Sequence, residues 1–139
     1  SFGLACNTSL LLMDEPTNGL DIMGKSQFRK VIAGAIDEKK CIIICTHQVK
    51  DMESLIDRIT VIDEGRILFD QTVDRITSKL SFKISFDNDE IKDALYREES
   101  LKGNAIITAN AGEDEGKLDL EMLYKAIVTN GEKVRSIFQ

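Results

Sequence analysis

The sequence predicts an α/β fold in which a parallel sheet is followed by a small α+β unit. Two wholly apolar runs, Leu10–Met13 and Cys41–Cys45, lie on either side of a segment with helical periodicity. Short apolar runs bounded by turn residues are typical of strands buried in a parallel sheet. After residue 80 the pattern changes, because apolar and polar residues begin to alternate as they do in half-exposed strands. We therefore place a domain boundary there, between residues 1–80 and residues 81–139.

Helices and further strands alternate through the first region. Asp21 is a candidate N-cap for a helix over residues 22–38, in which apolar side chains recur at helical spacing. The turn Asp63–Arg66 predicts a hairpin, because apolar residues flank it on both sides. The other elements that we expect are a helix over residues 49–56, strands over residues 59–62 and 67–69, and a helix over residues 72–80 with Thr72 as its N-cap. We expect the strand at residues 59–62 to be the third strand of the parallel sheet.

The second region is predicted to be an accessory α+β domain. We expect strands over residues 81–87 and 105–109, a helix over residues 120–129 that Asp119 caps, and a short last element over residues 134–138. The acidic stretch at residues 112–116 predicts a solvent-exposed loop or turn rather than an ion site, because its spacing matches no calcium loop.

Composition argues against several classes of protein. The 139 residues suffice for one medium domain, or for part of a domain with a small second one, and 42% of them are hydrophobic. The net charge of −6, without basic runs that aromatic residues interrupt, argues against nucleic acid as a partner. No apolar run approaches the about 20 residues that a membrane-spanning helix needs. Three cysteines without a Cys-x-x-Cys pair predict reduced, partly buried thiols rather than disulfides or a zinc site.

Polar side chains follow both apolar runs directly. Asp14 and Glu15 come after the first run, and Thr46 and His47 come after the second. Because open α/β sheets bind ligands at the carboxyl ends of their strands, we expect the two carboxylates to lie at a ligand-binding edge. Paired carboxylates there suit Mg²⁺ and a nucleotide, since one can hold the metal while the other orients or activates a water.

The stretch Leu10–Asp21, followed by His47, resembles the ATPases of ATP-binding cassette (ABC) transporters. The matches, in chain order, are the Walker B pattern at Leu10–Glu15, the D-loop at Asn18–Asp21 and the switch histidine at Cys45–His47. The resemblance covers about residues 4–80. It implies that the first region is part of a P-loop NTPase parallel sheet, namely the C-terminal half of an ABC ATPase.

The resemblance also implies a role for each site residue. Asp14 would hold Mg²⁺ through water, Glu15 would polarise the water that attacks the γ-phosphate, and His47 would hydrogen-bond that phosphate. The D-loop would line the interface between two ATP-binding subunits, and it comprises Asn18, Gly19, Leu20 and Asp21. The implied cofactors are ATP and Mg²⁺.

Partners and a location follow from the same resemblance. The full subunit would hydrolyse ATP as a dimer with a second ATP-binding subunit, beneath a membrane-spanning transporter subunit, and without nucleic acid. It would be cytoplasmic and peripheral on the inner face of the cell membrane. The Asn-Gly-Leu-Asp form of the D-loop and the small C-terminal region look more like exporters. Two alternatives stay open: a non-catalytic regulatory or dimerisation module derived from such an ATPase, and a soluble ABC ATPase of translation or DNA repair.

A pattern that matches a Walker A phosphate loop occurs inside the same stretch. Gly19–Ser26 fits its letters, Gly-x₄-Gly-Lys-Ser. We reject this interpretation, because a phosphate loop follows its strand directly and because the carboxylate of Asp21 would repel phosphates. Bulky Ile22 and Met23 would also crowd the loop. We expect Lys25 to be an exposed lysine on the first turn of the helix.

No true Walker A is present, so we expect these residues alone to bind ATP weakly and to be inactive. Ser1 and Gly3 resemble the Ser-x-Gly core of the ABC signature motif, which a helix normally separates from Walker B. Too few residues lie between Gly3 and Leu10 for that helix. We therefore expect a segment to be missing between Gly3 and Leu4.

Overall fold

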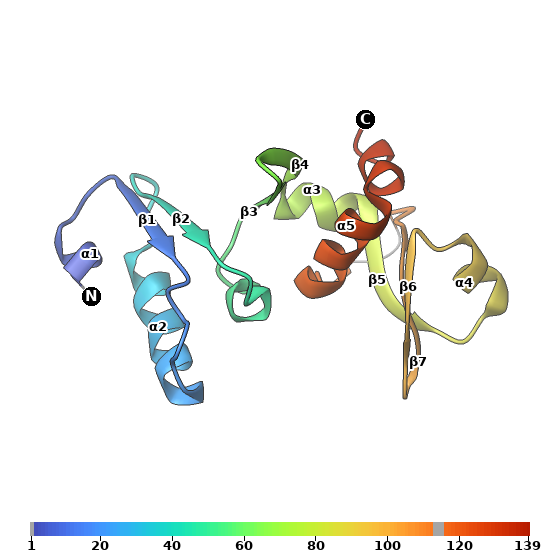
Figure 1. Ribbon diagram of the computed structural model, residues 1–139, viewed down its shortest axis with the longest axis horizontal. Helices are drawn as coiled ribbons and strands as arrows, with labels where there is room; N and C mark the ends of the chain where they lie inside the picture. The colour runs from blue at the N-terminus through green and yellow to red at the C-terminus, as the bar shows by residue number, and fades with distance from the viewer. Residues whose placement is uncertain (1, 113–115) are drawn as a thin grey trace. The chain divides into compact units, whose positions relative to one another are not determined.

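The computed structural model describes residues 2–112 and 116–139. The chain divides into two compact units, Ser1–Leu55 and Ile56–Gln139 (Figure 1). The boundary that we predicted near residue 80 therefore falls inside the second compact unit. A division by compactness does not show which residues derive from an ATPase domain. The assignment of residues 1–80 to an ATPase part therefore stays a prediction.

The first unit is a strand–helix–strand arrangement (Figure 1). Strands β1 (Leu10–Asp14) and β2 (Cys41–Cys45) pair in parallel, and helix α2 (Ile22–Ala35) connects them. A connection of this length is what a parallel pair requires. The remaining elements of the unit are the short helix α1 (Phe2–Ala5) and the 3₁₀ helix η1 (Val49–Met52).

Helix α2 begins where Asp21 caps it. The carboxylate of Asp21 accepts a hydrogen bond from the backbone N–H of Gly24 at 2.7 Å, which confirms the predicted N-cap. The helix ends at Ala35, before the predicted end at residue 38, because Ile36 adopts an extended backbone with φ −71° and ψ 123°. The helix predicted over residues 49–56 is also shorter, since only η1 forms there.

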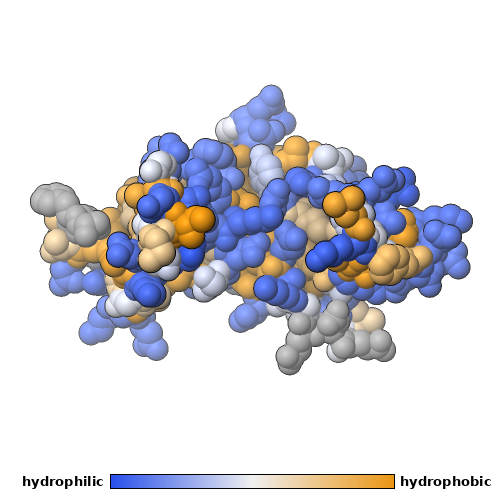
Figure 2. Space-filling view, turned by 90° about the horizontal axis from the view of Figure 1, so that it is seen from below, coloured by the Kyte–Doolittle hydropathy of each residue, from blue (hydrophilic) through white to orange (hydrophobic). Residues whose placement is uncertain are grey.

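Both strands of the first unit are only half buried. Successive side chains of a strand point to opposite faces, and the exposed set includes Leu10 (51% exposed), Leu12 (66%) and Ile43 (46%). The prediction of wholly buried strands is wrong here, because the sheet has two strands and its exposed and less exposed residues alternate. All three cysteines are exposed, whereas we predicted partly buried thiols. Apolar side chains reach the surface at several places on the face that Figure 2 shows.

Strand β3 (Arg58–Asp63) belongs to the second compact unit. It pairs with β4 (Arg66–Thr72) in an antiparallel hairpin, as the turn predicted, and these two strands form a sheet of their own. Glu64 and Gly65 make the turn with positive φ angles of 46° and 74°. Because β3 and the parallel pair of β1 and β2 belong to different compact units, the place of β3 as a third strand of the parallel sheet stays a prediction.

The second unit also contains a three-stranded antiparallel sheet in the order β5-β7-β6. Its further elements are α3 (Val73–Lys79), β5 (Leu80–Ser85), α4 (Asn88–Asp93), β6 (Tyr96–Ser100), β7 (Gly103–Ala109) and α5 (Leu120–Ser136). The predicted caps are confirmed, because Thr72 accepts a hydrogen bond from the N–H of Arg75 and Asp119 accepts one from the N–H of Met122. Seven described core residues of this unit have no exposed surface: Ile76, Leu80, Ile106, Ile107, Leu123, Ala126 and Val134.

Two elements of the second unit, α4 and β6, were not predicted. Strand β6 reads Tyr-Arg-Glu-Glu-Ser and lies at the sheet edge, where charged side chains are common. Helix α5 covers the helix predicted over residues 120–129 and reaches into the element predicted over residues 134–138, with a kink at Asn130 (φ −143°, ψ 41°). The side-chain amide of Asn130 donates to the carbonyl of Leu95 at 2.8 Å. Of the acidic stretch at residues 112–116, residues 113–115 lie outside the described residues.

Candidate functional site

The carboxyl ends of β1 and β2 bring Glu15 and His47 together. Asp14, the last residue of β1, lies opposite Cys45, the last residue of β2. The backbone N–H of Glu15 donates to the carbonyl of Cys45 at 2.7 Å. This bond extends the parallel ladder by one residue and places Glu15 beside the segment that begins at Thr46.

That segment makes three contacts with the carboxylate of Glu15. Oε2 accepts a hydrogen bond from the hydroxyl of Thr46 at 2.9 Å, and Oε1 accepts one from the backbone N–H of His47 at 3.0 Å. The ring nitrogen Nδ1 of His47 lies 2.5 Å from the same Oε1. Glu15 has a positive φ of 43°, which is uncommon for a residue other than glycine. The contacts therefore hold the carboxylate at a turn with an unusual backbone conformation.

These contacts keep Glu15 ionised. The side-chain hydrogen bond with His47 lowers the pKa of Glu15 below its ordinary value. Partial burial opposes this effect on the pKa, while the bonds from Thr46 and from the backbone N–H of His47 add to it. A carboxylate offers about four lone-pair positions, so one stays open for a water. Glu15 can thus orient a water, although its lowered pKa makes it a weak proton acceptor.

His47 and Asp14 are the more exposed members of the site. The side chain of His47 is 76% exposed, and because Nδ1 faces Glu15, Nε2 is the nitrogen that a ligand can reach. Asp14 is also exposed. Among the described residues, no group of three or more His, Cys, Asp and Glu side chains could hold a metal ion. A single carboxylate still fits Mg²⁺, which is usually bound through one or two carboxylates, waters and substrate phosphates.

Comparison with curated proteins finds relatives among transport ATP-binding proteins. An ABC transporter ATP-binding protein of Methanocaldococcus jannaschii is 30% identical over 97 residues, which cover 68% of this chain and 37% of that protein. The bacitracin transport ATP-binding protein of Bacillus licheniformis is 37% identical over 84 residues, 57% of this chain and 28% of the relative. The lantibiotic transport ATP-binding protein of Streptococcus pyogenes is 36% identical over 74 residues, 53% of this chain and 32% of the relative. No family model matches the chain.

The chain belongs to the ABC transporter ATP-binding proteins. It spans about a third of the length of these three relatives. Within the residues that the structure describes, no helix is both long enough and apolar enough to cross a bilayer.

The segment of this ABC protein that matches the D-loop forms consecutive turns after β1. The N–H of Asn18 donates to the carbonyl of Glu15 at 3.1 Å, and the N–H of Leu20 donates to the carbonyl of Thr17 at 3.2 Å. Gly19 has a φ of 76°, which glycine adopts readily. All four matched residues are exposed: Asn18, Gly19, Leu20 and Asp21. Their role at a dimer interface stays a prediction.

The Walker A-like pattern of the ABC protein, Gly19–Ser26, does not form a phosphate cradle. The N–H of Gly24 is bonded to Asp21, and the ammonium group of Lys25 lies 2.8 Å from Oδ2 of Asp51. Two groups that would bind a phosphate in a true loop are therefore bound by carboxylates. This agrees with our rejection of the segment as a Walker A loop. The prediction of an exposed Lys25 is wrong, however, because its side chain is 27% exposed and ion-paired.

The expected remnant of the ABC signature motif receives little support. Ser1 lies outside the described residues, and Gly3 lies in α1. Gly3 and Leu4 are consecutive residues of that helix. The expectation of a segment missing between them stays a prediction.

Three residues of the site in this ABC protein were given no role by the sequence. Thr46 donates to Glu15, and its place beside His47 at a strand end was the one available signal. Gln48 and Asp51 contact Lys25, which lies far earlier in the chain. Nothing in the sequence near them indicates that contact.

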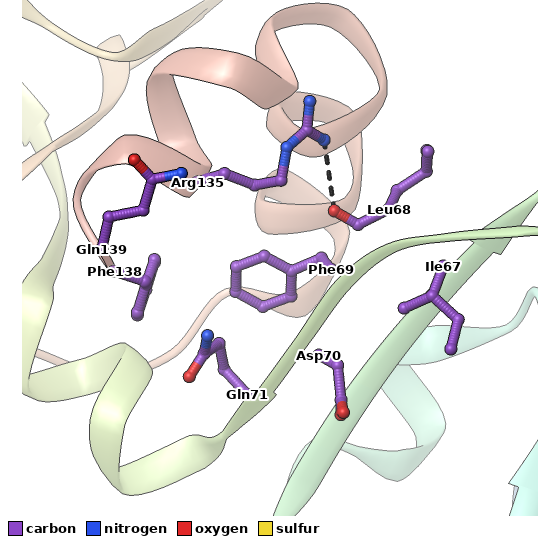
Figure 3. Close-up of a pocket in the computed structure, with 8 residues that line it drawn as sticks. All are labelled: Ile67, Leu68, Phe69, Asp70, Gln71, Arg135, Phe138 and Gln139. Atoms are coloured by element: carbon purple, nitrogen blue, oxygen red, sulfur yellow. Dashed lines mark hydrogen bonds between the residues drawn. The ribbon is translucent and has the colours of Figure 1, made fainter.

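The second unit contains a hollow of about 250 Å³ that is separate from these residues (Figure 3). Its lining comprises Ile67, Leu68, Phe69, Asp70, Gln71, Arg135, Phe138 and Gln139. Arg135 donates to the carbonyl of Leu68 at 3.1 Å, and the rings of Phe69 and Phe138 meet edge to face with centroids 5.3 Å apart. No residue that matches an ABC motif lines it, so we assign no ATP chemistry to this hollow.

Proposed function

We propose that this chain is part of the ATP-hydrolysing subunit of an ABC transporter of the exporter type. The observation that carries the proposal is the Glu15 carboxylate, which Thr46 and His47 hold at the carboxyl ends of two parallel strands. Hydrolysis of ATP needs one group that positions the attacking water and another that contacts the transferred phosphate. Glu15 and His47 are suited to these two tasks.

Each polar side chain of the site has its own task in this proposal. Asp14 would hold Mg²⁺ through water, and the metal would supply positive charge against the phosphates when ATP is bound. Glu15 orients the attacking water with its open lone-pair position. His47 offers Nε2 to the γ-phosphate, and because Nδ1 donates to Glu15, Nε2 donates when the ring carries both protons. The contact with Glu15 holds the ring in that orientation.

The proposed subunit works as part of a larger assembly. The exposed D-loop residues face a second ATP-binding subunit, and the dimer lies beneath a membrane-spanning subunit on the cytoplasmic side. The names of two relatives, which refer to bacitracin transport and lantibiotic transport, support a role in export. Residues 81–139 form an accessory region that follows the ATPase part.

We also propose that the phosphate loop of this subunit lies outside these 139 residues. The support is that the chain spans about a third of its relatives and that its one Walker A-like pattern is engaged in other contacts. Without that loop, most of the triphosphate has no partner. The 139-residue chain alone then binds Mg-ATP weakly, and a tight affinity measured by calorimetry would contradict this part of the proposal.

ATP turnover in the longer protein that contains this chain and its phosphate loop tests the proposal. Glu15→Gln keeps the size of the side chain but removes its charge, so we expect kcat to fall by about 10²- to 10⁴-fold. The KM for ATP should change little, because Glu15 acts on the water rather than on the nucleotide. Glu38→Gln is a matched control, since Glu38 is exposed and belongs to none of the motifs.

Equal turnover in Glu15→Gln and the unmodified protein would remove Glu15 from the mechanism. That result would favour the alternative, in which the chain is a non-catalytic regulatory or dimerisation module.

A further inference from the structure

A lysine at the start of helix α2 contacts the segment that contains His47. The Nζ of Lys25 lies 2.8 Å from Oδ2 of Asp51 and donates to Oε1 of Gln48 at 2.9 Å. Gln48 directly follows His47, and Asp51 lies in η1. We refer to residues 46–51 as the switch segment. Lys25 thus makes two contacts with the switch segment from a different element.

The switch segment is bonded to Glu15 at its other end. The hydroxyl of Thr46 donates to Oε2 of Glu15 at 2.9 Å and accepts a hydrogen bond from the backbone N–H of Gln48, also at 2.9 Å. Together with the bond from Lys25 to the side chain of Gln48, these bonds connect Lys25 to Glu15. The connection runs through residues that also hold His47 in place.

The groups that make these contacts are partly buried, which increases the contribution of the contacts to stability. Thr17 has no exposed surface, and its hydroxyl donates to Oδ2 of Asp51 at 3.5 Å. The side chains of Lys25 and Asp51 are 27% and 18% exposed, and Arg29 lies 3.8 Å from Oδ1 of Asp51. Fully exposed ion pairs contribute little to stability, whereas removing one partner of a buried pair leaves an uncompensated charge. This pair lies between those cases, and Lys25 lies nearer to Asp51 than Arg29 does.

Helix stability does not explain a lysine at this position. A positive charge is unfavourable in the first turn of a helix, where the helix dipole is itself positive. A 3₁₀ helix of four residues such as η1 has poor hydrogen-bond geometry and little stability of its own. The contacts of Lys25 therefore hold η1 and the switch segment against α2. They do not serve to stabilise α2 itself.

We propose that Lys25 is a positioning residue, which holds the switch segment so that Thr46 and His47 remain in contact with Glu15. It acts through Gln48 and Asp51, and it needs no contact with nucleotide. The effect of Lys25 on ATP turnover rests on the proposed function. Its effect on the contact between Glu15 and His47 does not depend on that function.

Residue-resolved amide hydrogen exchange on the 139-residue chain tests the geometry without nucleotide. In Lys25→Met, the N–H groups of His47 and Gln48 should exchange about tenfold faster, as expected for the loss of a hydrogen bond to a charged group. The N–H groups of β2 should keep their exchange rates. Lys25→Arg should restore most of the protection, because it retains a cation for Asp51. Lys30→Met, which changes an exposed lysine of the same helix, should have no effect.

Two results of the exchange experiment would overturn the inference. Unchanged exchange at His47 and Gln48 in Lys25→Met would mean that Lys25 does not hold the switch segment. Equally faster exchange across β1, β2 and the switch segment would mean that Lys25 only stabilises the unit. If Lys25→Met does not fold, Lys25→Gln replaces it with the same expected and contrary outcomes.

Turnover in the longer protein separates this inference from the proposed function. Lys25→Met should lower kcat and leave the KM for ATP unchanged, because it disturbs Glu15 and His47 rather than nucleotide binding. An unchanged kcat in Lys25→Met, together with an inactive Glu15→Gln, would overturn the inference and leave the proposed function in place. Full activity in Glu15→Gln would overturn the proposed function, and hydrogen exchange would then decide the positioning role alone.

Discussion

The two compact units of this chain differ in how they are held together. Among the described apolar residues of the first unit, only Ile32 and Met52 are buried, and the strands expose side chains such as Leu12. The second unit buries apolar residues from its hairpin, its sheet and its helices, including Phe69, Ile106 and Leu123. The candidate site therefore belongs to the unit with the smaller core, and hydrogen bonds and ion pairs are a larger part of what orders it.

The difference bears on function, because functional segments are commonly drawn from the less stable parts of a protein. Glu15, Thr46 and His47 are held by bonds between polar groups that are partly exposed. Such bonds can be exchanged for bonds to a ligand at a small cost in free energy. A site built on a fully packed core would not have this freedom.

The largest effect that we expect comes from removing a core side chain of the second unit. Leu123→Ala deletes a side chain with no exposed surface, so the free energy of unfolding should fall by about 2–5 kcal/mol. Leu12→Ala in the first unit should lower it by about 0.5 kcal/mol or less, because that side chain is 66% exposed. Urea denaturation of both variants measures the two changes. Similar losses would contradict the contrast between the units.

A medium effect is expected from the helix caps, which occur in both units. Asp21 caps α2 and Asp119 caps α5, and each accepts one hydrogen bond from a backbone N–H. Substitution of either aspartate by alanine should lower helix stability by about 1 kcal/mol. Because the first unit has the smaller core, amide exchange should accelerate more along α2 in Asp21→Ala than along α5 in Asp119→Ala. Equal acceleration would show that the two helices are equally dependent on their caps.

The smallest effect concerns acid. The pKa of Glu15 is lowered chiefly by its hydrogen bond with His47, so its contribution to stability is complete above the pKa of the unfolded chain. That contribution is lost as the pH falls through the lower pKa of the folded state. We expect the protection factor of the His47 N–H to decrease over this range, and Glu15→Gln to abolish the decrease.

The second unit provides the comparison for the acid experiment. The pKa of Glu90 is lowered first by Lys83 and then by Ser85, in the same direction as that of Glu15. Protection near Glu90 should respond to acid in Glu15→Gln as it does in the unmodified chain. If the His47 N–H keeps its acid response in Glu15→Gln, another group is responsible for it.

Residues close together in the sequence account for most of the correct predictions. The strands β1 and β2, the hairpin of β3 and β4, and the caps at Asp21, Thr72 and Asp119 all follow from local patterns. The approach of Glu15 to His47 could also be predicted, because each residue directly follows a strand and the carboxyl ends of parallel strands lie at one edge.

Contacts between distant residues decided the rest. The charged edge strand β6 owes its structure to pairing with β7, which no pattern within its own sequence indicates. The kink at Asn130 depends on a bond to Leu95, and the partial burial of Lys25 depends on Asp51. A residue's own sequence neighbourhood does not reveal which partner a folded chain will bring to it.

The amino-acid sequence by itself determined most of the strands and helices, the family to which the chain belongs, and the residue types at the candidate site. Only the tertiary structure decided that β6 pairs with β7, that one set of strand side chains stays exposed, and that Lys25 binds Asp51. The physical reason is that backbone propensity and hydrophobic period act over a few residues. Burial and ion pairing depend on surfaces that form only when distant segments meet.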